Sequence, residues 1–545
     1  DAAAGVINVI TKVASKLQHS ELGLRMGSFD TQNGWMQYGG EWKGFDIAMT
    51  ADLLHTDGHG PFIRSDAQSR NDLTYDTSAS LAPGDANFGW NNADLRFSMA
   101  RDNWRAQLGY SRHDELETGM TGAGALDPVT EGDDSRFSAE LFYENPHFGD
   151  DWLLNAELRY RHIDYSSGDG FQEWPPGYTD ATGVYPDGVL NHMESAEHSV
   201  IGEVSGLYRG YADHAITLGA GLRWQDIYSV DHWVNSGVDG NGEPLPPGGP
   251  LVDISGSPYA FAPDKSRTIS YAYLQDVWGI SENLELTMGA RFDHNSDFGG
   301  SFTPRIALVW QANEALTTKF MYGQAFRAPN FQELYSETSF SLPNPGLDPE
   351  ESETWELALS YTPRKELHLG INLYRYEQTD FIALQVEPGQ SKLKYQNTGE
   401  YNVNGLELEA WWRPSEDLSF SGNYSYNSPE DKRTYAFAFR LPRQQAYLRG
   451  DWHFLPDWSL NIQGNWVGEI ERSPGDTRSD INDSFVTDST LRYFGIKNWE
   501  FALSVHNLFD EDVRSYTSSR IPEDLPSPGR SSYLEARYHL DTLFK

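Results

Sequence analysis

The sequence predicts an all-β protein: a 22-stranded antiparallel transmembrane β-barrel with short periplasmic turns and long extracellular loops. Three observations carry this prediction. Apolar and polar residues alternate along many segments, short and long connections alternate between these segments, and the number of segments is even. Membrane barrels formed by a single chain combine these three features.

The alternation is clearest in the segment 284–296. One face of this segment is apolar and carries Leu284, Leu286, Met288, Ala290 and Phe292. The residues between them, which form the other face, are Glu285, Thr287, Gly289 and Arg291. In a membrane barrel the apolar face meets lipid and the polar face lines a wet lumen, whereas in a soluble sandwich these faces meet a core and water. Many segments reach about ten residues, which suits a bilayer crossing of ~9–11 residues better than the usual soluble strand of about five or six.

The connections supply the second observation. Short turns such as Lys43-Gly44 and Ser281-Glu282-Asn283 alternate with long polar segments such as 56–91 and 168–195. Two connections on the long side, near 29–30 and 297–300, are short. The predicted strands are 19–28, 31–42, 45–55, 92–100, 104–114, 134–145, 152–167, 196–212, 214–235, 266–280, 284–296, 301–312, 315–326, 353–362, 366–379, 401–413, 418–428, 443–454, 459–470, 485–495, 498–508 and 530–540.

Composition excludes several classes of protein. A net charge of -39, from 41 basic and 80 acidic residues, repels phosphate backbones and argues against nucleic-acid partners. This charge fits either a solvated surface or an acidic mouth that gathers cations such as Ca²⁺. The absence of cysteine excludes disulfides and thiol catalysis. No Gly-x-Ser-x-Gly elbow and no phosphate-binding loop occurs, so we expect no enzyme.

Motifs along the whole chain resemble those of TonB-dependent outer-membrane receptors. The opening, Asp1 to Lys12, resembles the final strand of that family's plug domain. The stretches Phe326-Arg327-Ala328-Pro329 and Asn344-Pro345-Gly346-Leu347, with Pro349-Glu350 after them, resemble the paired boxes that flank a long extracellular loop. Further similar segments are Asn397-Thr398-Gly399, Gly405 to Glu409, Asn507-Leu508-Phe509-Asp510 and the last strand, from Pro528-Gly529-Arg530 to Leu540.

The resemblance implies the domain organisation and the function. Residues 1–18 are expected to be the end of a plug and its link, and 19–545 the barrel in the bacterial outer membrane. The implied activity is uptake, driven through TonB, of a scarce nutrient such as a ferric siderophore, with outer-membrane lipid and lipopolysaccharide around the barrel. Alternatives are a haem or cobalamin receptor and, if the plug is truly missing, a passive pore. No cofactor or resident metal is expected.

Ligand contacts are expected from aromatic and arginine side chains near the extracellular mouth, because chelates offer flat, often anionic surfaces. The candidate substrate-binding residues are Phe171, Trp174, Tyr178, Tyr259, Phe261, Arg327, Phe331 and Tyr335. The simpler interpretation is that each packs its own loop or joins an aromatic girdle.

Haem and calcium are two further candidate ligands. No His lies between Asn330 and Pro343, where haem receptors of this family often carry one, although His192, His198 or His232 could supply an axial nitrogen. Asp239, Asn241 and Glu243 are spaced like part of a calcium loop without its bidentate Glu, so a solvated turn is the favoured interpretation.

Overall fold

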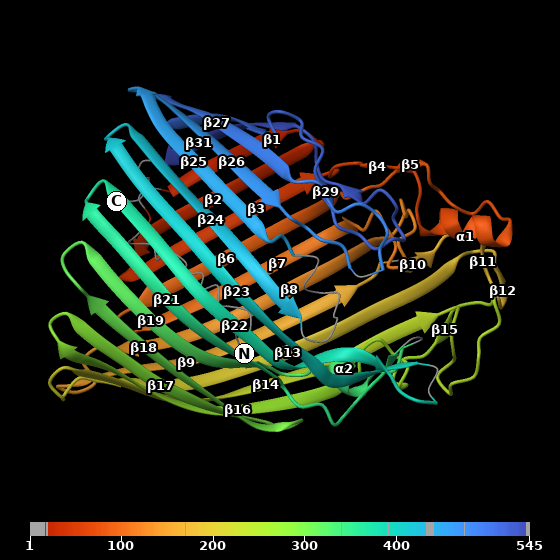
Figure 1. Cartoon of the computed structure of the whole chain (residues 1–545), viewed down its shortest axis with the longest axis horizontal. Coiled ribbons are helices and arrows are strands. Elements are labelled where there is room, and N and C mark those ends of the chain that lie inside the picture. Colours follow the sequence, from red (N-terminus) through yellow and green to blue (C-terminus); the bar gives the residue numbers. More distant parts are fainter. Residues whose placement is uncertain are drawn as a thin grey trace.

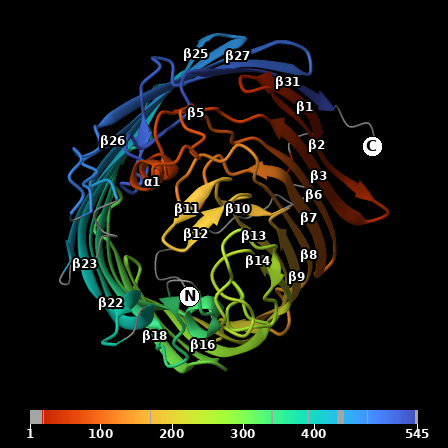
Figure 2. The same ribbon diagram turned by 90° about the vertical axis from the view of Figure 1, so that its right-hand side faces the viewer.

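The computed structural model describes residues 17, 20–168, 170–338, 341–389, 392–431, 441–473 and 475–540. In these residues the chain forms one closed antiparallel barrel, and its long loops gather at one end (Figure 1). Viewed from that end, α1 and β10 to β12 lie inside the ring of barrel strands (Figure 2). The predicted plug end, 1–18, lies outside the described residues except for Leu17.

Twenty-two long strands make the wall, as predicted. They are β1 (Ser20–Gly27), β2 (Thr31–Trp42), β3 (Phe45–Thr56), β6 (Trp90–Arg101), β7 (Trp104–Glu117), β8 (Glu131–Asn145), β9 (Trp152–Ser166), β13 (Val189–Tyr208), β14 (His214–Val234), β16 (Lys265–Ser281), β17 (Leu284–Asn295), β18 (Gly299–Gln311), β19 (Leu316–Arg327), β21 (Glu350–Arg364), β22 (Leu367–Val386), β23 (Leu393–Ser415), β24 (Leu418–Asp431), β25 (Gln444–Leu455), β26 (Trp458–Gly468), β27 (Ser484–Ile496), β28 (Trp499–His506) and β31 (Ser531–Leu540). Each pairs with its neighbours along the chain, and β1 closes the ring on β31 from Ser20↔Leu540 to Gly27↔Tyr533.

The long loops carry short elements of their own, which the sequence did not predict. The short strands are β4 (Phe62–Ile63), β5 (Gly84–Asp85), β10 (Phe171–Trp174), β11 (Tyr178–Asp180), β12 (Gly183–Tyr185), β15 (Val252–Asp253), β20 (Ser341–Leu342), β29 (Arg514–Ser515) and β30 (Leu525–Pro526). Two helices, α1 (Ala67–Tyr75) and α2 (Phe331–Tyr335), each begin at a capping box, on Asp66 and Asn330. Such boxes satisfy the first free amide groups of a helix.

Three strand ends differ from the prediction by more than a few residues. β13 begins at Val189 instead of 196, β22 ends at Val386 instead of 379, and β23 begins at Leu393 instead of 401. A register shift lies between Gln378 and Phe381, where β22 carries an extra residue opposite β23. A bulge inserts a residue and reverses the phase of the alternation, so the pattern of β22 breaks in the sequence where the strand itself continues. At Ala196 and Glu197 the extra residue is Tyr228 of the neighbouring β14, so this shift leaves the alternation of β13 intact.

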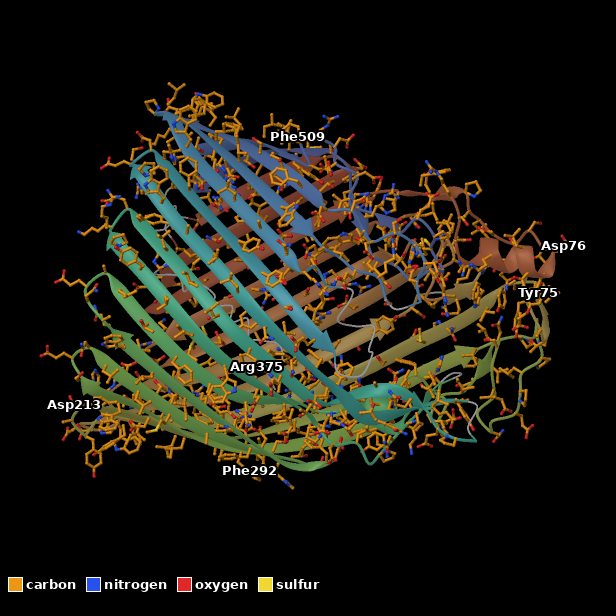
Figure 3. All side chains as sticks on the ribbon, viewed as in Figure 1. Tyr75, Asp76, Asp213, Phe292, Arg375 and Phe509 are labelled. Atoms are coloured by element: carbon orange, nitrogen blue, oxygen red, sulfur yellow. The ribbon has the colours of Figure 1, made fainter. Side chains whose placement is uncertain are left out.

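The wall turns its apolar face outward. Leu222, Leu274 and Phe292 are 59%, 57% and 51% exposed, and Phe292 projects from the outer side of the barrel (Figure 3). Aromatic pairs line the end with the short turns, as in Trp104–Tyr143 at 4.8 Å and Trp458–Tyr493 at 4.7 Å between ring centroids. This matches the aromatic girdle of a membrane barrel.

The two ends of the barrel differ in construction. Asp213, in a short turn, and Tyr75, in α1, lie at opposite ends (Figure 3). The clusters of buried apolar residues lie among the long loops, around Leu126 and around Leu334. None of the helices formed by the described residues is long and apolar enough to cross a membrane.

Two neighbouring residues of β17 test the assignment of the faces. Met288 is 43% exposed on the outer face, and Thr287 points to the lumen. We expect Met288→Arg to destabilise the folded barrel by roughly 2–4 kcal/mol, because a guanidinium near the middle of the bilayer loses its hydration. Thr287→Arg, on the wet face, should cost far less. Urea titration of the folded protein in lipid vesicles measures both, and equal losses would contradict the assignment.

Candidate functional site

A first cluster of loops covers part of the mouth. Ile63 and Ala86, from the connection between β3 and β6, pack with Leu126 from the connection between β7 and β8, and Leu525 packs against them. The amide of Leu126 donates to the carboxylate of Asp66 at 2.7 Å, and Asp66 is almost fully buried. Segments from three connections are thus held together by a small apolar core and a buried carboxylate.

An arginine–aspartate latch ties one further loop to the connection that carries Leu525. It consists of Arg472, Asp476 and Arg478 from the connection between β26 and β27, and Asp524 from the connection between β28 and β31. Arg472 contacts Asp524 at 2.5 Å, and Arg478 contacts Asp476 at 2.6 Å and Asp524 at 3.2 Å. Arg478 also donates to the carbonyl oxygens of Thr517 and Ile521.

The latch shifts the acidities of its carboxyl groups. Hydrogen bonds from Arg478 lower the pKa of Asp476 to about 2. Burial alone would raise the pKa of Asp524, but hydrogen bonds from Arg472 and from the Thr517 amide outweigh burial and lower it. Carboxyl groups whose pKa values are lowered by folding stabilise the folded state above their unfolded values, and this stabilisation is lost as the pH falls through the lowered pKa values.

A second cluster of loops contains the two box motifs. Leu334 of α2, Leu347 of the second box and Ile382 of β22 form its buried core. Arg327, at the end of β19, contacts Glu350 at 2.6 Å and Glu333 at 3.1 Å. Glu350 is buried and also accepts hydrogen bonds from Gln378 and from the amide of Ile382. Arg327 therefore has a structural role between the boxes, and its contact with a ligand stays a prediction.

Four more candidate residues lie in or beside this second cluster. Phe331 stacks on Arg267 with 4.5 Å from the guanidinium to the ring, and Tyr335 lies 5.5 Å from the ammonium of Lys265. Tyr259 lies 5.8 Å from the ammonium of Lys392, which pairs with Glu337 at 2.7 Å. Phe261 meets the ring of His232 edge-on at 5.4 Å. These four rings are half-buried, and cations cover three of them.

The remaining candidates lie in the connection between β9 and β13. Trp174 and Tyr178 stack at 4.5 Å with 18° between their planes, and Tyr185 follows at 5.7 Å. Burial raises the pKa of Tyr178 to about 12, so its hydroxyl stays protonated and can donate. Phe171 pairs with Asn191 of β13. The structure therefore groups Trp174 with Tyr178 and Phe331 with Tyr335, and leaves the roles of all these rings in binding as predictions.

The barrel wall below the loops carries residues that the candidate set missed. The register of β9, β13, β14 and β16 places arginines in two adjacent rows on one face. The rows are Arg161–Ser199–Gln225–Arg267 and Arg159–Ile201–Arg223–Ile269. Leu158 and Leu222 are exposed on the opposite, outer face, so the arginine face lines the lumen. Arg291 of β17 continues the patch beside Tyr273.

Carboxylates pair with several members of this arginine wall, the lumenal patch of Arg159, Arg161, Arg223, Arg267 and Arg291. Arg159 pairs with Glu157 at 2.6 Å, Arg267 with Asp297 at 2.7 Å and Arg291 with Asp293 at 2.7 Å. Arg223 lies close enough to Arg161 and Arg267 to be repelled by their like charges, and it is attracted by the opposite charge of Glu197. The alternation in the sequence places Arg291 on the polar face, but only the register brings Arg159 and Arg161 beside Arg223.

Two glycines keep this part of the wall flat. A Cβ on Gly219 or Gly221 would lie 2.4 Å or 2.5 Å from the ring of Tyr273 or Tyr271. The two rings therefore lie across the glycines, and their hydroxyls donate to Glu203 at 2.7 Å and 2.6 Å. The two tyrosine rings therefore lie along the wall beside the arginines.

The histidines named for haem already have partners. His232 accepts the amide N–H of Phe261 at its Nδ1 atom, which leaves the proton on Nε2 and no free lone pair. His192 pairs with Glu194 at 3.3 Å. His198 stacks on Tyr228 at 4.8 Å, beside the exposed Trp224 on the outer face. In this conformation all three imidazoles have structural roles.

The loop that resembled a calcium site forms a turn. One carboxylate oxygen of Asp239 accepts the amide groups of Asn241 at 2.8 Å and Glu243 at 3.0 Å. This is the pattern of an Asx turn, which the Gly-rich sequence favours. The favoured interpretation, a solvated turn, accounts for these contacts.

Comparison with known proteins agrees with this architecture. The family described as "TonB dependent receptor-like, beta-barrel" matches residues 59–508. An iron-regulated outer membrane virulence protein of Vibrio cholerae is 26% identical over 310 residues, which are 52% of this chain and 46% of that protein. The matched stretch thus spans about half the length of that relative.

Solved structures show the same fold. The ferric enterobactin receptor of Pseudomonas aeruginosa superposes with a TM-score of 0.75 and 18% identity, over 99% of this chain and 83% of that one. A siderophore receptor of Acinetobacter baumannii gives 0.72 and 16%, over 98% and 81%. The chain belongs to the TonB-dependent receptor family, and it is an outer-membrane barrel. This is a family of receptors and transporters, not of enzymes.

The latch can be tested by proteolysis. We expect Asp524→Asn to increase tryptic cleavage after Arg472 and Arg478 at least about tenfold at pH 7, because it leaves two buried guanidinium groups without their shared carboxylate. Glu523→Gln is the control, since Glu523 makes only an exposed pair with Arg64 at 3.5 Å.

The same digestion has a pH dependence. With an acid-stable protease, the wild-type loops should stay protected above about pH 4, the ordinary value for Asp, and lose protection as the pH falls towards the lowered values. Equal cleavage of the Asp524→Asn and Glu523→Gln variants would contradict the latch.

Proposed function

We propose that this protein takes up a ferric siderophore across the outer membrane, with energy delivered through TonB. The observation that carries the proposal is the arginine wall beneath the extracellular loops. Guanidinium groups bind carboxylates and catecholate oxygens through charge-assisted hydrogen bonds, so the cargo is expected to be an anionic chelate.

The arginine wall stands out because the whole chain is acidic. The net charge is -39, yet the lumenal faces of β9, β14, β16 and β17 concentrate arginines. At physiological ionic strength charges beyond about 8 Å are largely screened. An anion that passes the loops is therefore expected to respond to these arginines and to the carboxylates Glu157, Asp293 and Asp297 paired with them, and less to the distant acidic surface.

The loop aromatics suit the same cargo. Trp174 and Tyr178 form a stacked, half-buried pair on the side of the first loop cluster, and Phe331 and Tyr335 form a tilted pair at 6.4 Å in the second. Flat ligand surfaces pack well on such rings. The candidate residues Phe171, Tyr259, Phe261 and Arg327 complete the surface proposed to receive the ligand.

Relatives support the class of cargo. The similar proteins include receptors for ferric enterobactin and another siderophore, and a relative is iron-regulated. Haem is less favoured, because His192, His198 and His232 each have a partner. TonB is proposed to act on a segment before the barrel, with residues 1–18 as the end of the plug, and lipopolysaccharide and lipid to surround the wall.

Binding of a panel of ligands tests the proposal. Full-length protein is titrated with ferric siderophores, haem and cobalamin while intrinsic tryptophan fluorescence is recorded. Saturable quenching by one ferric siderophore is expected. Binding of haem or cobalamin alone would overturn the cargo, and steady ion conductance through the full-length protein would favour a passive pore.

Two arginine variants test the wall itself. The double variant Arg161→Gln/Arg223→Gln should weaken binding of the ferric siderophore by at least about tenfold, since each charge-assisted hydrogen bond contributes about 1.5–3 kcal/mol. Arg375→Gln is the control, because Arg375 lies on the outer face of β22 in a pair with Glu377. The loss should shrink at high salt, where the wild-type attraction is screened. Unchanged affinity in the double variant would remove the wall from the binding surface.

A further inference from the structure

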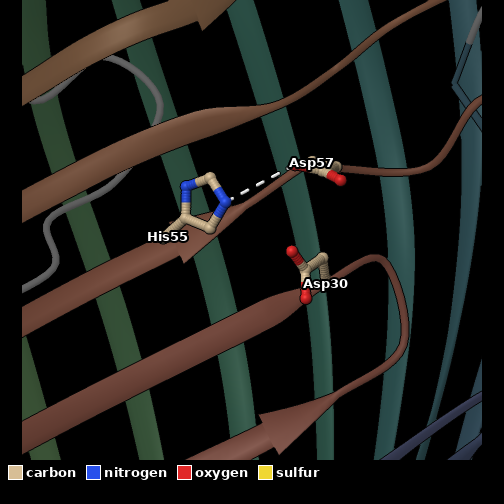
Figure 4. A group of neighbouring side chains, drawn as sticks. All are labelled: Asp30, His55 and Asp57. Atoms are coloured by element: carbon tan, nitrogen blue, oxygen red, sulfur yellow. Dashed lines mark ion pairs between the residues drawn. The ribbon is translucent and has the colours of Figure 1, made fainter.

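Three potential metal ligands meet at the extracellular end of the first strands. Asp30 lies in the short turn between β1 and β2, and His55 and Asp57 lie at the end of β3. Their ligand atoms all lie within 4.8 Å of one another, and all three residues are exposed (Figure 4). His55 has the same odd-numbered position in β3 as the exposed Met49 and Leu53, so it lies on the same face of the strand. It therefore faces outward, just beyond the lipid-facing part of β3.

Hydrogen bonds connect the two segments that carry these residues. The amide of Asp57 donates to the carbonyl oxygen of Phe29 at 2.9 Å, and the hydroxyl of Thr56 donates to the same oxygen at 3.2 Å. Thr31 and Thr56 share a buried hydrogen bond at 2.9 Å. The turn that carries Asp30 is thereby fixed to the segment that carries His55 and Asp57.

A chain of hydrogen bonds sets the tautomer of His55. The amide nitrogen of Asn91 donates to Glu115 at 2.7 Å, so the amide oxygen of Asn91 faces the imidazole. That oxygen lies 2.7 Å from Nδ1 of His55, which must therefore carry the proton. The lone pair of Nε2 is left pointing away from Asn91. This is the arrangement of a metal-binding histidine whose other nitrogen is held by a neighbouring group.

Nε2 of His55 faces the carboxylate of Asp57 at 3.5 Å. This distance is too long for a normal hydrogen bond. When the imidazole is neutral and its proton is on Nδ1, the lone pair of Nε2 faces a lone pair of the Asp57 carboxylate. Two ligand atoms on one tetrahedral zinc ion, each at about 2.0–2.2 Å, lie about 3.4 Å apart. The separation thus suits a shared metal ion.

We propose that Asp30, His55 and Asp57 bind one divalent transition-metal ion of the zinc type. An imidazole with two carboxylates suits zinc and its neighbours better than calcium or magnesium, which prefer oxygen ligands alone. Exposure of the three side chains leaves room for water as a further ligand. This proposal does not depend on the cargo of the receptor.

The ion would strengthen the closure of the barrel, where β1 pairs with β31. The same turn is bound to the last strand, since the Ser28 amide donates to the carbonyl of Ser532 at 2.9 Å and the Ser532 amide donates to the hydroxyl of Ser28 at 2.9 Å. A metal ion on Asp30 and the end of β3 joins three strands beside the place where β1 meets β31. Binding to the folded state alone raises its stability.

The test is a zinc titration of the full-length protein, purified without a histidine tag, in detergent at pH 8. Wild type should bind one zinc ion at least about tenfold more tightly than His55→Gln, and zinc should raise the thermal unfolding midpoint of wild type only. Asn91→Leu should weaken zinc binding by roughly 10–100-fold through loss of the oriented imidazole. Cobalt provides a second readout, because its visible absorption reports on the ligands.

His162→Gln is the matched control. His162 and Asp164 form another histidine–aspartate pair two residues apart on a strand, but they are half-buried and at 2.9 Å contact each other directly. Zinc binding and the cobalt spectrum should be unchanged in this variant. The proposal is overturned if His55→Gln binds zinc like wild type, if His162→Gln loses as much, or if calcium gives the same stabilisation in wild type and His55→Gln.

Discussion

The structure depends on one constraint: at the depth of the hydrocarbon, every backbone N–H and C=O group must find a partner within the protein. Closure of β1 on β31 meets this constraint for the last free edge, and its register runs without a break from Ser20↔Leu540 to Gly27↔Tyr533. Once the ring is closed, one face of each strand must meet lipid and the other the lumen. The outward leucines and the inward arginines are both consequences of this geometry.

A closed wall with its apolar face outside has no central hydrophobic core. Close apolar packing therefore lies in the loops, where Leu126 and Leu334 are almost fully buried. Ion pairs accompany each cluster, with Asp524 between two arginines in one loop pair and Arg327 between two carboxylates in another. The mouth is thus built from loops that are connected by small apolar clusters and a few ionic contacts.

The lumen and the rim use charged groups differently. Inside, arginines of the lumenal wall stand beside carboxylates such as Glu157, Asp293 and Asp297. At the rim, Asp30 and Asp57 face an imidazole whose tautomer is set by Asn91 and Glu115. An acidic chain can therefore place arginines in its lumen and a histidine with two carboxylates at its rim, because the charges within a few ångströms, more than the net charge, set the local electrostatics.

The sequence by itself determined the strands, their order, their faces and the family, because alternation and turn residues are local properties of the chain. The segment from Leu284 to Phe292 shows both faces without any partner strand. Only the tertiary structure decided which side chains meet. Arg159 and Arg223 come into adjacent positions through Ile201 of a third strand, and Arg25 reaches Glu535 across 510 positions of sequence. The bulge after Gln378 hid the continuation of β22 for the same reason: register belongs to pairs of strands, and a single strand does not encode it.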